Sequence, residues 1–224
     1  MSEREIILGR IRDALKAQAP LPGSHDRAPV SATTSTPRQW LPKVGESFDE
    51  QLALFARNAA TLKVDLQMVS SIDQAHMTLA KMADTQKWKS VATHDGMLAG
   101  VAANWLSLPT INTTAGFDVN ELETCDVGIS ECDALIAQTG SVMVTNRSAG
   151  GRALSVLPPH HVVLARREQL VADLPAAIEL VKKKYANNYP SIISFITGPS
   201  RTGDIERILV LGAHGPKKLT IFCL

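Results

Sequence analysis

The residue types best suited to chemistry gather in one ten-residue segment near the end of the chain, Thr197–Glu206. Its two glycines allow backbone amides to approach a ligand closely, and its hydroxyls and arginine are donors that suit a carboxylate or a phosphate. Its two carboxylates could orient those donors or act as a general base. The segment therefore predicts an anion site, with candidate binding residues Gly198, Ser200, Arg201 and Thr202 and candidate catalytic residues Asp204 and Glu206.

A tight turn is the alternative interpretation of this segment, because serine, threonine and aspartate side chains commonly cap a following helical turn. The segment follows an apolar stretch that predicts a strand over residues 191–196. In an open α/β sheet, ligands bind at the carboxyl ends of the strands. We therefore favour a site over a simple turn.

A second candidate segment, Gly212–Pro216, also comes directly after an apolar strand. It contains His214, whose side chain can act as an acid or a base near neutral pH, followed by Gly215. We predict a catalytic role for His214 and an anion-binding role for Gly215. A hairpin turn with a histidine bonded to the backbone is the alternative, and the residues alone favour it slightly.

Three weaker candidate features precede these segments. Thr139 and Gly140 lie between two apolar stretches and join the candidate anion-binding residues. Residues 146–152 combine two arginines with two glycines, which suits either an anion-holding loop or a solvated connection. His160 and His161 are neighbours at a predicted strand, so their side chains point to opposite faces and a shared metal is not expected.

Signatures of a resident cofactor are absent from the sequence. It has no P-loop, no GxGxxG fingerprint and no GxSxG nucleophile elbow. The three cysteines, Cys125, Cys132 and Cys223, are irregularly spaced and lack the clustering that holds iron–sulfur centres. We therefore expect no cofactor and no metal on this chain, and we expect the thiols to pack as small apolar groups.

The composition argues against nucleic-acid and membrane partners. Lysine and arginine number 23 against 22 aspartates and glutamates, and aromatic residues make up only 4%. Neither a basic field nor a stacking platform for bases is expected. No apolar run approaches the roughly 20 residues that span a bilayer, and the charged N-terminus lacks the features of a signal peptide. These observations favour the cytoplasm.

The hydrophobic periodicity predicts an α/β fold with a mainly parallel sheet, helices on both faces and a more antiparallel C-terminal part. A proline-rich stretch separates an N-terminal helix from the rest, so we predict a helix and linker over 1–46 and an α/β domain over 47–224. The predicted helices are 3–17, 48–62, 71–86 and 168–185. The predicted strands are 65–69, 90–93, 108–111, 127–130, 141–145, 161–165, 191–196, 208–211 and 219–224.

Four segments in this order resemble the LUD domain family, and its short lactate utilisation protein C (LutC/YkgG) type in particular. They are Asp133–Ser141, Leu157–His160, Thr197–Glu206 and Gly212–Pro216. Ala213 departs mildly from the branched residue that is common at this place in the family. The resemblance implies a NagB/RpiA/CoA-transferase-like fold and a part in oxidising L-lactate to pyruvate alongside iron–sulfur subunits.

Within that resemblance three roles stay open. The chain could be a non-redox or ligand-binding subunit that takes a small carboxylate or phosphate, rather than a self-sufficient oxidoreductase. It could be a stand-alone enzyme of the sugar-phosphate isomerase, CoA-transferase and formyltetrahydrofolate cyclo-ligase group, acting on an anionic small molecule. It could also be an interaction protein whose helix 3–17 docks on a partner, on its own domain or in a homo-oligomer.

Overall fold

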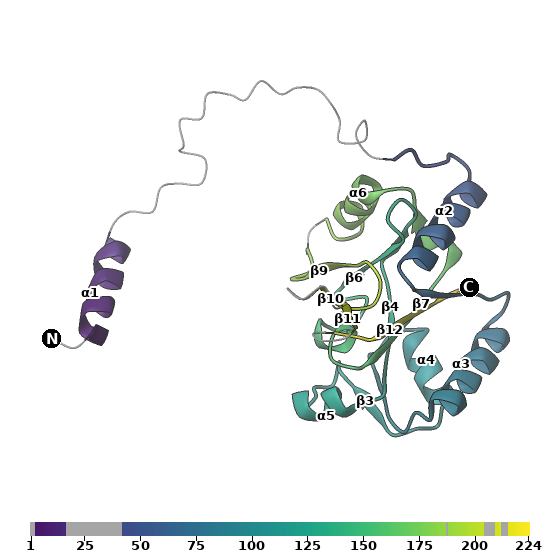
Figure 1. Ribbon diagram of the computed structural model, residues 1–224, viewed down its shortest axis with the longest axis horizontal. Helices are drawn as coiled ribbons and strands as arrows, with labels where there is room; N and C mark the ends of the chain where they lie inside the picture. Colours follow the sequence, from purple (N-terminus) through teal and green to yellow (C-terminus); the bar gives the residue numbers. More distant parts are fainter. Residues whose placement is uncertain (1–2, 17–41, 187, 204–208, 212–214) are drawn as a thin grey trace. The chain divides into compact units, whose positions relative to one another are not determined.

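The computed structural model describes residues 3–16, 42–186, 188–203, 209–211 and 215–224 (Figure 1). The chain divides into two units, residues 1–41 and 42–224. The first contains helix α1, Glu3–Lys16, as the periodicity predicts. Its apolar side chains Ile6, Ile7 and Leu8 are exposed. The predicted boundary at residues 46 and 47 stays a prediction.

The second unit is built on a six-stranded sheet in which every pair of neighbouring strands is parallel. The spatial order is β1-β12-β7-β4-β2-β3, so the last strand of the chain lies between two earlier ones. This architecture confirms the predicted α/β class with a mainly parallel sheet. The strands are β1 Asp65–Met68, β2 Val91–Thr93, β3 Thr110–Asn112, β4 Val127–Glu131, β7 His160–Ala165 and β12 Lys218–Cys223.

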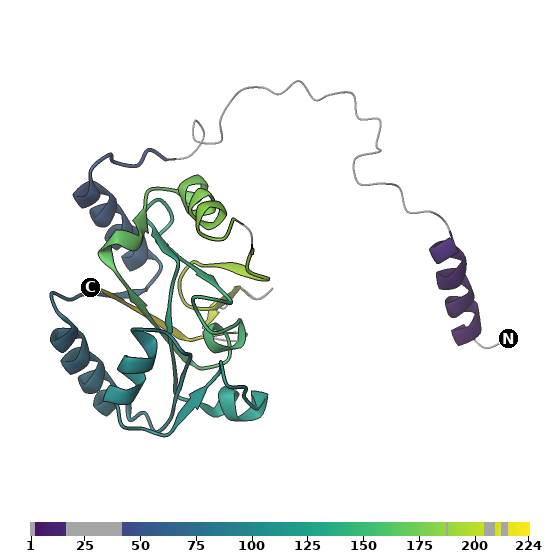
Figure 2. The same ribbon diagram turned by 180° about the vertical axis from the view of Figure 1, so that it is seen from behind.

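Apolar clusters cover both faces of this sheet. On one face the sheet packs against α3 and α4, and the cluster joins Leu79 to Leu164 and Phe222. On the other face Phe55 of α2 packs with Val163 and Ile221. In both views the C-terminus, which follows β12, lies between α2 and α3 (Figures 1 and 2). The helices are α2 Phe48–Thr61, α3 Ile72–Gln86, α4 Ala99–Trp105, α5 Val119–Thr124 and α6 Leu174–Lys184.

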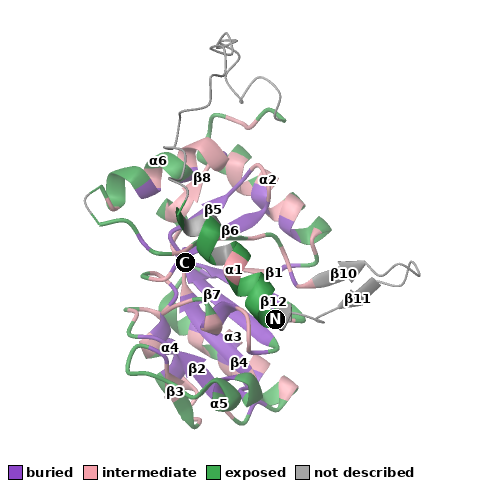
Figure 3. Cartoon of the chain, turned by 90° about the vertical axis from the view of Figure 1, so that its left-hand side faces the viewer, coloured by how far each residue is buried: buried purple, intermediate pink, exposed green. Residues whose placement is uncertain are grey.

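Burial on both faces explains why the central strands are apolar almost without interruption. All six residues of β7 are buried, and five of the six residues of β12 are buried (Figure 3). His160 and His161 at the start of β7 are therefore core side chains. The described residues include no helix that is long and apolar enough to cross a membrane.

The antiparallel strands form a separate sheet rather than the C-terminal part of the main sheet, which corrects the prediction. The order of this second sheet is β8-β5-β6-β9, and β6 pairs antiparallel with both β5 and β9. A further antiparallel pair joins β10 and β11. These strands are β5 Ala134–Ile136, β6 Ser141–Thr145, β8 Leu170–Val171, β9 Ile193–Ile196, β10 Arg201–Gly203 and β11 Leu209–Leu211.

The predicted helix over 168–185 is wrong in its first third. Residues 167–169 form a 3-10 turn and 170–171 form strand β8, and α6 begins only at Leu174. The Asp173 side chain accepts a hydrogen bond from the Ala176 amide at 2.8 Å, and Pro175 occupies the first turn. An N-cap and a proline in the first turn together mark a helix start.

Candidate functional site

The segment Thr197–Glu206 does not leave a strand of the parallel sheet, so the carboxyl-end argument for it fails. It leaves β9, which belongs to the second sheet. The prediction of a loop is also wrong in part, because Arg201–Gly203 forms β10 and pairs with β11. The Ser200 amide donates to the Pro216 carbonyl at 2.9 Å, which brings the two candidate segments together at Ser200 and Gly215.

Several predicted site residues lie outside the described residues. These are Asp204, Glu206 and His214, together with the side chains of Arg201 and Thr202. Their catalytic or anion-binding roles stay predictions.

The glycines at 140 and 198 have a structural explanation in the packing of α2. Both have positive φ, at 67° and 89°. A Cβ on Gly140 would lie 2.8 Å from the Ala59 amide nitrogen, and one on Gly198 would lie 3.0 Å from the Leu62 carbonyl oxygen. Both glycines therefore let a turn approach α2 closely, and the anion-binding role predicted for them and for neighbouring Thr139 stays a prediction.

The topology itself points to a different crevice. From β2 the chain crosses to edge strand β3 and then returns to β4 on the other side of β2. Ligands of open α/β sheets bind where the crossover direction reverses, at the carboxyl ends of the two strands. Here His94 follows β2 directly and Glu131 ends β4. These two residues mark the switch point of the sheet, and we call the carboxyl ends of β2 and β4, where they lie, the switch-point crevice.

His94 is held in one orientation at this crevice. The side chain is 5% exposed, and its Nε2 accepts a hydrogen bond from the Glu131 amide at 3.3 Å. Burial lowers the pKa of His94, although the nearby carboxylates of Glu131 and Asp95 oppose that shift. The ring is therefore neutral at pH 7, with its proton on Nδ1 as a donor.

The Glu131 carboxylate is positioned by the chain that follows β2. Its Oε1 accepts from the Leu98 amide at 2.7 Å and from the Ala99 amide at 3.3 Å. These bonds tie the segment before α4 to the end of β4. The crevice thus places a carboxylate beside a neutral imidazole, a combination that can exchange a proton with a bound hydroxyl group.

The loop at 146–152 closes over the same crevice. The Thr113 hydroxyl lies 3.0 Å from the Gly150 carbonyl and 3.2 Å from the Thr93 carbonyl, so the loop is anchored at the ends of β2 and β3. Arg147 and Arg152 are exposed on this loop, and the Arg147 guanidinium stands 5.8 Å from the Tyr185 ring centroid. The loop therefore packs against His94 through Gly150, whereas the Arg147 guanidinium lies over Tyr185.

Replacing Gly150 with alanine is expected to destabilise the fold by about 3 kcal/mol. Its φ is 61°, and a Cβ would overlap the Cβ of His94 and lie 2.7 Å from the Thr113 hydroxyl oxygen, which adds overpacking to backbone strain. Gly151→Ala is the matched control, since φ there is 105° but a Cβ would meet nothing within 4 Å. We expect a loss of about 1 kcal/mol there. Urea unfolding of both variants measures the difference, and equal losses would contradict the packing argument.

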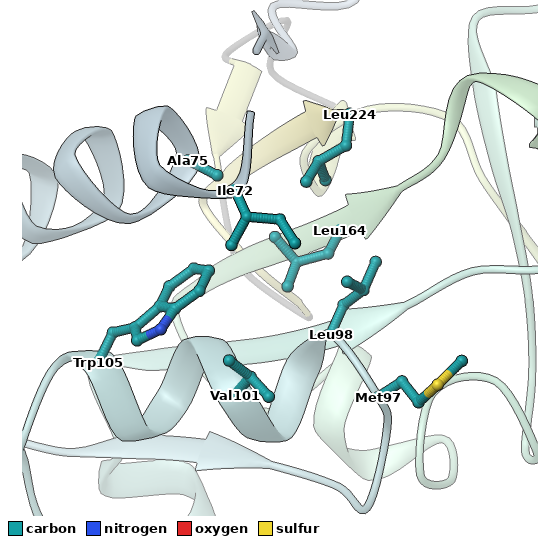
Figure 4. A pocket seen from close by; sticks show the side chains of 8 residues that line it. All are labelled: Ile72, Ala75, Met97, Leu98, Val101, Trp105, Leu164 and Leu224. Atoms are coloured by element: carbon teal, nitrogen blue, oxygen red, sulfur yellow. The ribbon is translucent and has the colours of Figure 1, made fainter. Parts of the chain in front are cut away.

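An apolar pocket of about 80 Å³ lies at the same edge of the sheet, between α3 and α4 (Figure 4). Its wall includes Leu98, whose amide donates to Glu131, and the exposed side chains of Met97, Ile72 and Val101. Apolar surface beside the polar crevice can hold a methyl or methylene group of a ligand.

The described residues include no group of three or more histidines, cysteines or acids that could hold a metal ion. Cys125, Cys132 and Cys223 are all buried, and burial raises the pKa of each thiol. Protonated, buried thiols are poor metal ligands. The cysteines behave as the small apolar residues that the sequence predicts.

Sequence reasoning missed both His94 and Glu131. Neither belongs to a short motif, and 36 residues separate them along the chain. A usable signal was present, because each polar side chain follows a predicted apolar strand, 90–93 and 127–130, almost directly. Only the strand order places these two ends side by side.

The LUD domain model matches residues 72–224, which is most of the second unit and more than half of the chain. The chain belongs to the LUD domain family. Proteins named Lactate utilization protein C are among its relatives. That of Geobacillus kaustophilus is 27% identical over 213 residues, covering 86% of this chain and 88% of the relative. That of Shouchella clausii is 29% identical over 179 residues, covering 77% and 78%.

A solved structure shares the fold. The crystal structure of a DUF162 family protein from Deinococcus radiodurans superposes with a TM-score of 0.61. The two are 21% identical, and the match covers 80% of this chain and 99% of that one. The sequence-based recognition of a LUD domain of the lactate utilisation protein C type is confirmed.

Proposed function

We propose that this LUD protein acts in lactate utilisation as a ligand-binding, non-redox component, with the switch-point crevice as the place where a small hydroxycarboxylate binds. The observation that carries the proposal is the match to Lactate utilization protein C over 86% of the chain. A relative that is matched over most of its length shares the same domain. We therefore extend the role in lactate utilisation, which the relative's name states, to this chain.

The geometry of the crevice supports this ligand class. A 2-hydroxycarboxylate needs a cation for its carboxylate and an acceptor for its hydroxyl. In this proposal the exposed Arg152 of loop 146–152 supplies the cation, since Arg147 lies over Tyr185, and the Glu131 carboxylate supplies the acceptor. The neutral His94 ring offers a donor, and the apolar wall at Leu98 suits a methyl group.

The buried thiols support the second half of the proposal, in which partner chains carry the electrons. Iron–sulfur centres are held by thiolates, whereas burial keeps the three thiols of this chain protonated. We therefore propose that iron–sulfur subunits are the redox partners and that the complex works in the cytoplasm. The chain's own contribution is to bind and orient the substrate.

Reconstitution tests this function. Lactate-dependent reduction of a dye should require this chain together with its iron–sulfur partners. Glu131→Gln should lower that rate at least tenfold while the complex still assembles, because the amide keeps the shape but not the basicity. His76→Gln, a substitution of an α3 histidine stacked on Trp105 rather than at the crevice, is the control. Full activity of the partners alone would refute the proposal.

A further inference from the structure

The second sheet ends in a strand whose outer side is unpaired within the described part of the chain. β9, Ile193–Ile196, is the last strand in the order β8-β5-β6-β9, and it pairs with β6 alone. It lies at the margin of the second unit (Figure 1). An edge strand presents a row of backbone donors and acceptors, which is a template for pairing with another strand.

One hydrogen bond shows which backbone groups of β9 point outward. The Asn146 amide donates to the Ile192 carbonyl at 3.3 Å, so Ile192 turns its backbone groups toward the β6 side. Successive residues of a strand turn their N–H and C=O groups to opposite sides. The groups of Ile193 and Phe195 therefore point away from β6, and they have no hydrogen-bond partner among the described residues.

The sequence of this edge lacks the features that usually prevent strand pairing. Residues 189–200 include no charged residue, and β9 contains neither proline nor glycine. Ile193 and Phe195 are 37% and 39% exposed, and Tyr189 before the strand is 54% exposed. Soluble proteins protect an edge strand with lysines, prolines or bulges, or they cover it. An apolar edge without such protection is expected to be covered.

The two exposed side chains of β9 lie on the same face of the sheet. Phe195 is opposite Met143 in the register of β6 and β9, and Met143 packs with Ala177 and Val181 of α6. Ile193 is two residues from Phe195, so it lies on this α6 face as well. The α6 helix buries Met143 but leaves Ile193 and Phe195 partly exposed at the edge.

We infer that β9 is the interface of a homodimer, in which it pairs antiparallel with β9 of a second copy about a two-fold axis at Ser194. This register places Ile193 opposite Phe195 of the second copy, and Phe195 opposite its Ile193. The outward N–H and C=O groups of these residues then form hydrogen-bonded pairs, and the two copies of Ser194 form the non-hydrogen-bonded pair between them. The two second sheets become one continuous sheet.

The side chains favour a second copy as the occupant. A two-fold interface must be complementary to itself, and this register meets that condition. It makes the contact between an aromatic and a β-branched side chain twice, which is a favourable cross-strand pair. On the opposite face the two Ser194 hydroxyls meet and can bond to each other. Since the edge has no charged residue, pairing of identical strands brings no like charges together.

The mass of the full chain in solution tests the inference. Size-exclusion chromatography with light scattering, over a dilution series, should give about twice the 24.1 kDa of one chain. Phe195→Lys should raise the dissociation constant of the dimer at least tenfold, because a lysine at an edge opposes pairing. Phe117→Lys is the matched control, since Phe117 is also 39% exposed but lies just before α5, and it should leave the dimer unchanged.

Melting temperatures show whether both lysine variants are folded. A native chain that is monomeric throughout the dilution series would overturn the inference. So would a folded Phe195→Lys variant whose dimer is as stable as that of the native chain, because the interface would then lie elsewhere.

Cysteine cross-linking tests the register independently. The Cα atoms of the two Ser194 residues should be about 4.5 Å apart, which is within the range that a disulfide spans. Ser194→Cys should therefore yield a covalent dimer on mild oxidation. In Ser191→Cys the two positions are about 20 Å apart in this register, so that variant should stay uncross-linked. The native thiols are all buried. Equal cross-linking of both variants, or of neither, would contradict the proposed pairing.

Discussion

Between pH 7.5 and pH 5.0 the free energy of unfolding is expected to fall by about 4 kcal/mol, because two core histidines stay neutral in the folded chain. Burial lowers the pKa of His160 to about 4 and that of His161 to about 3. In the unfolded chain each titrates near 6.5, so the unfolded state gains protons first as the pH falls. Each histidine therefore removes about 1.4 kcal/mol per pH unit below its unfolded pKa.

Urea unfolding at a series of pH values measures this loss. In His161→Gln the amide can still bond to the Ser130 hydroxyl, which lies 2.8 Å from Nε2 in the native chain, but it does not titrate. The loss between the two pH values should then shrink by about 2 kcal/mol. An unchanged pH dependence in this variant would show that other groups govern acid stability. The lowered pKa of His94 acts in the same direction.

Replacing Lys184 with methionine is expected to cost about 3 kcal/mol, because it strands a buried carboxylate. Asp133 is 2% exposed, and its Oδ1 accepts from the Lys184 ammonium at 2.6 Å and from the Tyr185 hydroxyl at 2.8 Å. Burial alone would raise the pKa of Asp133, but hydrogen bonds from Lys184, Ser148, Tyr185 and Thr145 hold it below its usual value. Without the ammonium, the carboxylate loses the cation that balances its charge.

Lys182 provides the matched control on the same helix. Its ammonium lies 2.7 Å from the Glu179 carboxylate, but both side chains are more than half exposed. Lys182→Met should therefore change the free energy of unfolding by less than about 1 kcal/mol. Comparable losses in the two variants would mean that burial of Asp133 contributes little.

Most of the secondary structure follows from local patterns. The predicted strand over 161–165 and the predicted helix over 71–86 are confirmed, and both ends of each element agree within one residue. The short helices α4 and α5, of 7 and 6 residues, lack enough turns for a periodic signal and were missed. Residues 168–173 have the periodicity of a helix. In the structure, residues 170–171 form β8 and pair with β5, so the tertiary pairing overrides the local preference for a helix.

The candidate sites, like the secondary structure, were predicted correctly only in part. The order of the motifs was enough to recognise the family. The contact that joins the two segments at Ser200 and Pro216 was not predicted and comes from the structure. The position of those segments was wrong, because β9 belongs to the second sheet. His94 and Glu131 were not singled out, since strand order rather than sequence spacing makes them neighbours.

The sequence by itself determined the type of most elements, the family and the burial of the cysteines, because these depend on short-range periodicity, motif order and composition. Only the tertiary structure decided which end of the sheet each segment reaches. Strand β12 inserts between β1 and β7, and this non-local pairing brings Lys218 and Thr220 beside His160 and Asp65. Such contacts arise from hydrogen bonding between strands far apart in the chain, for which local spacing carries no signal.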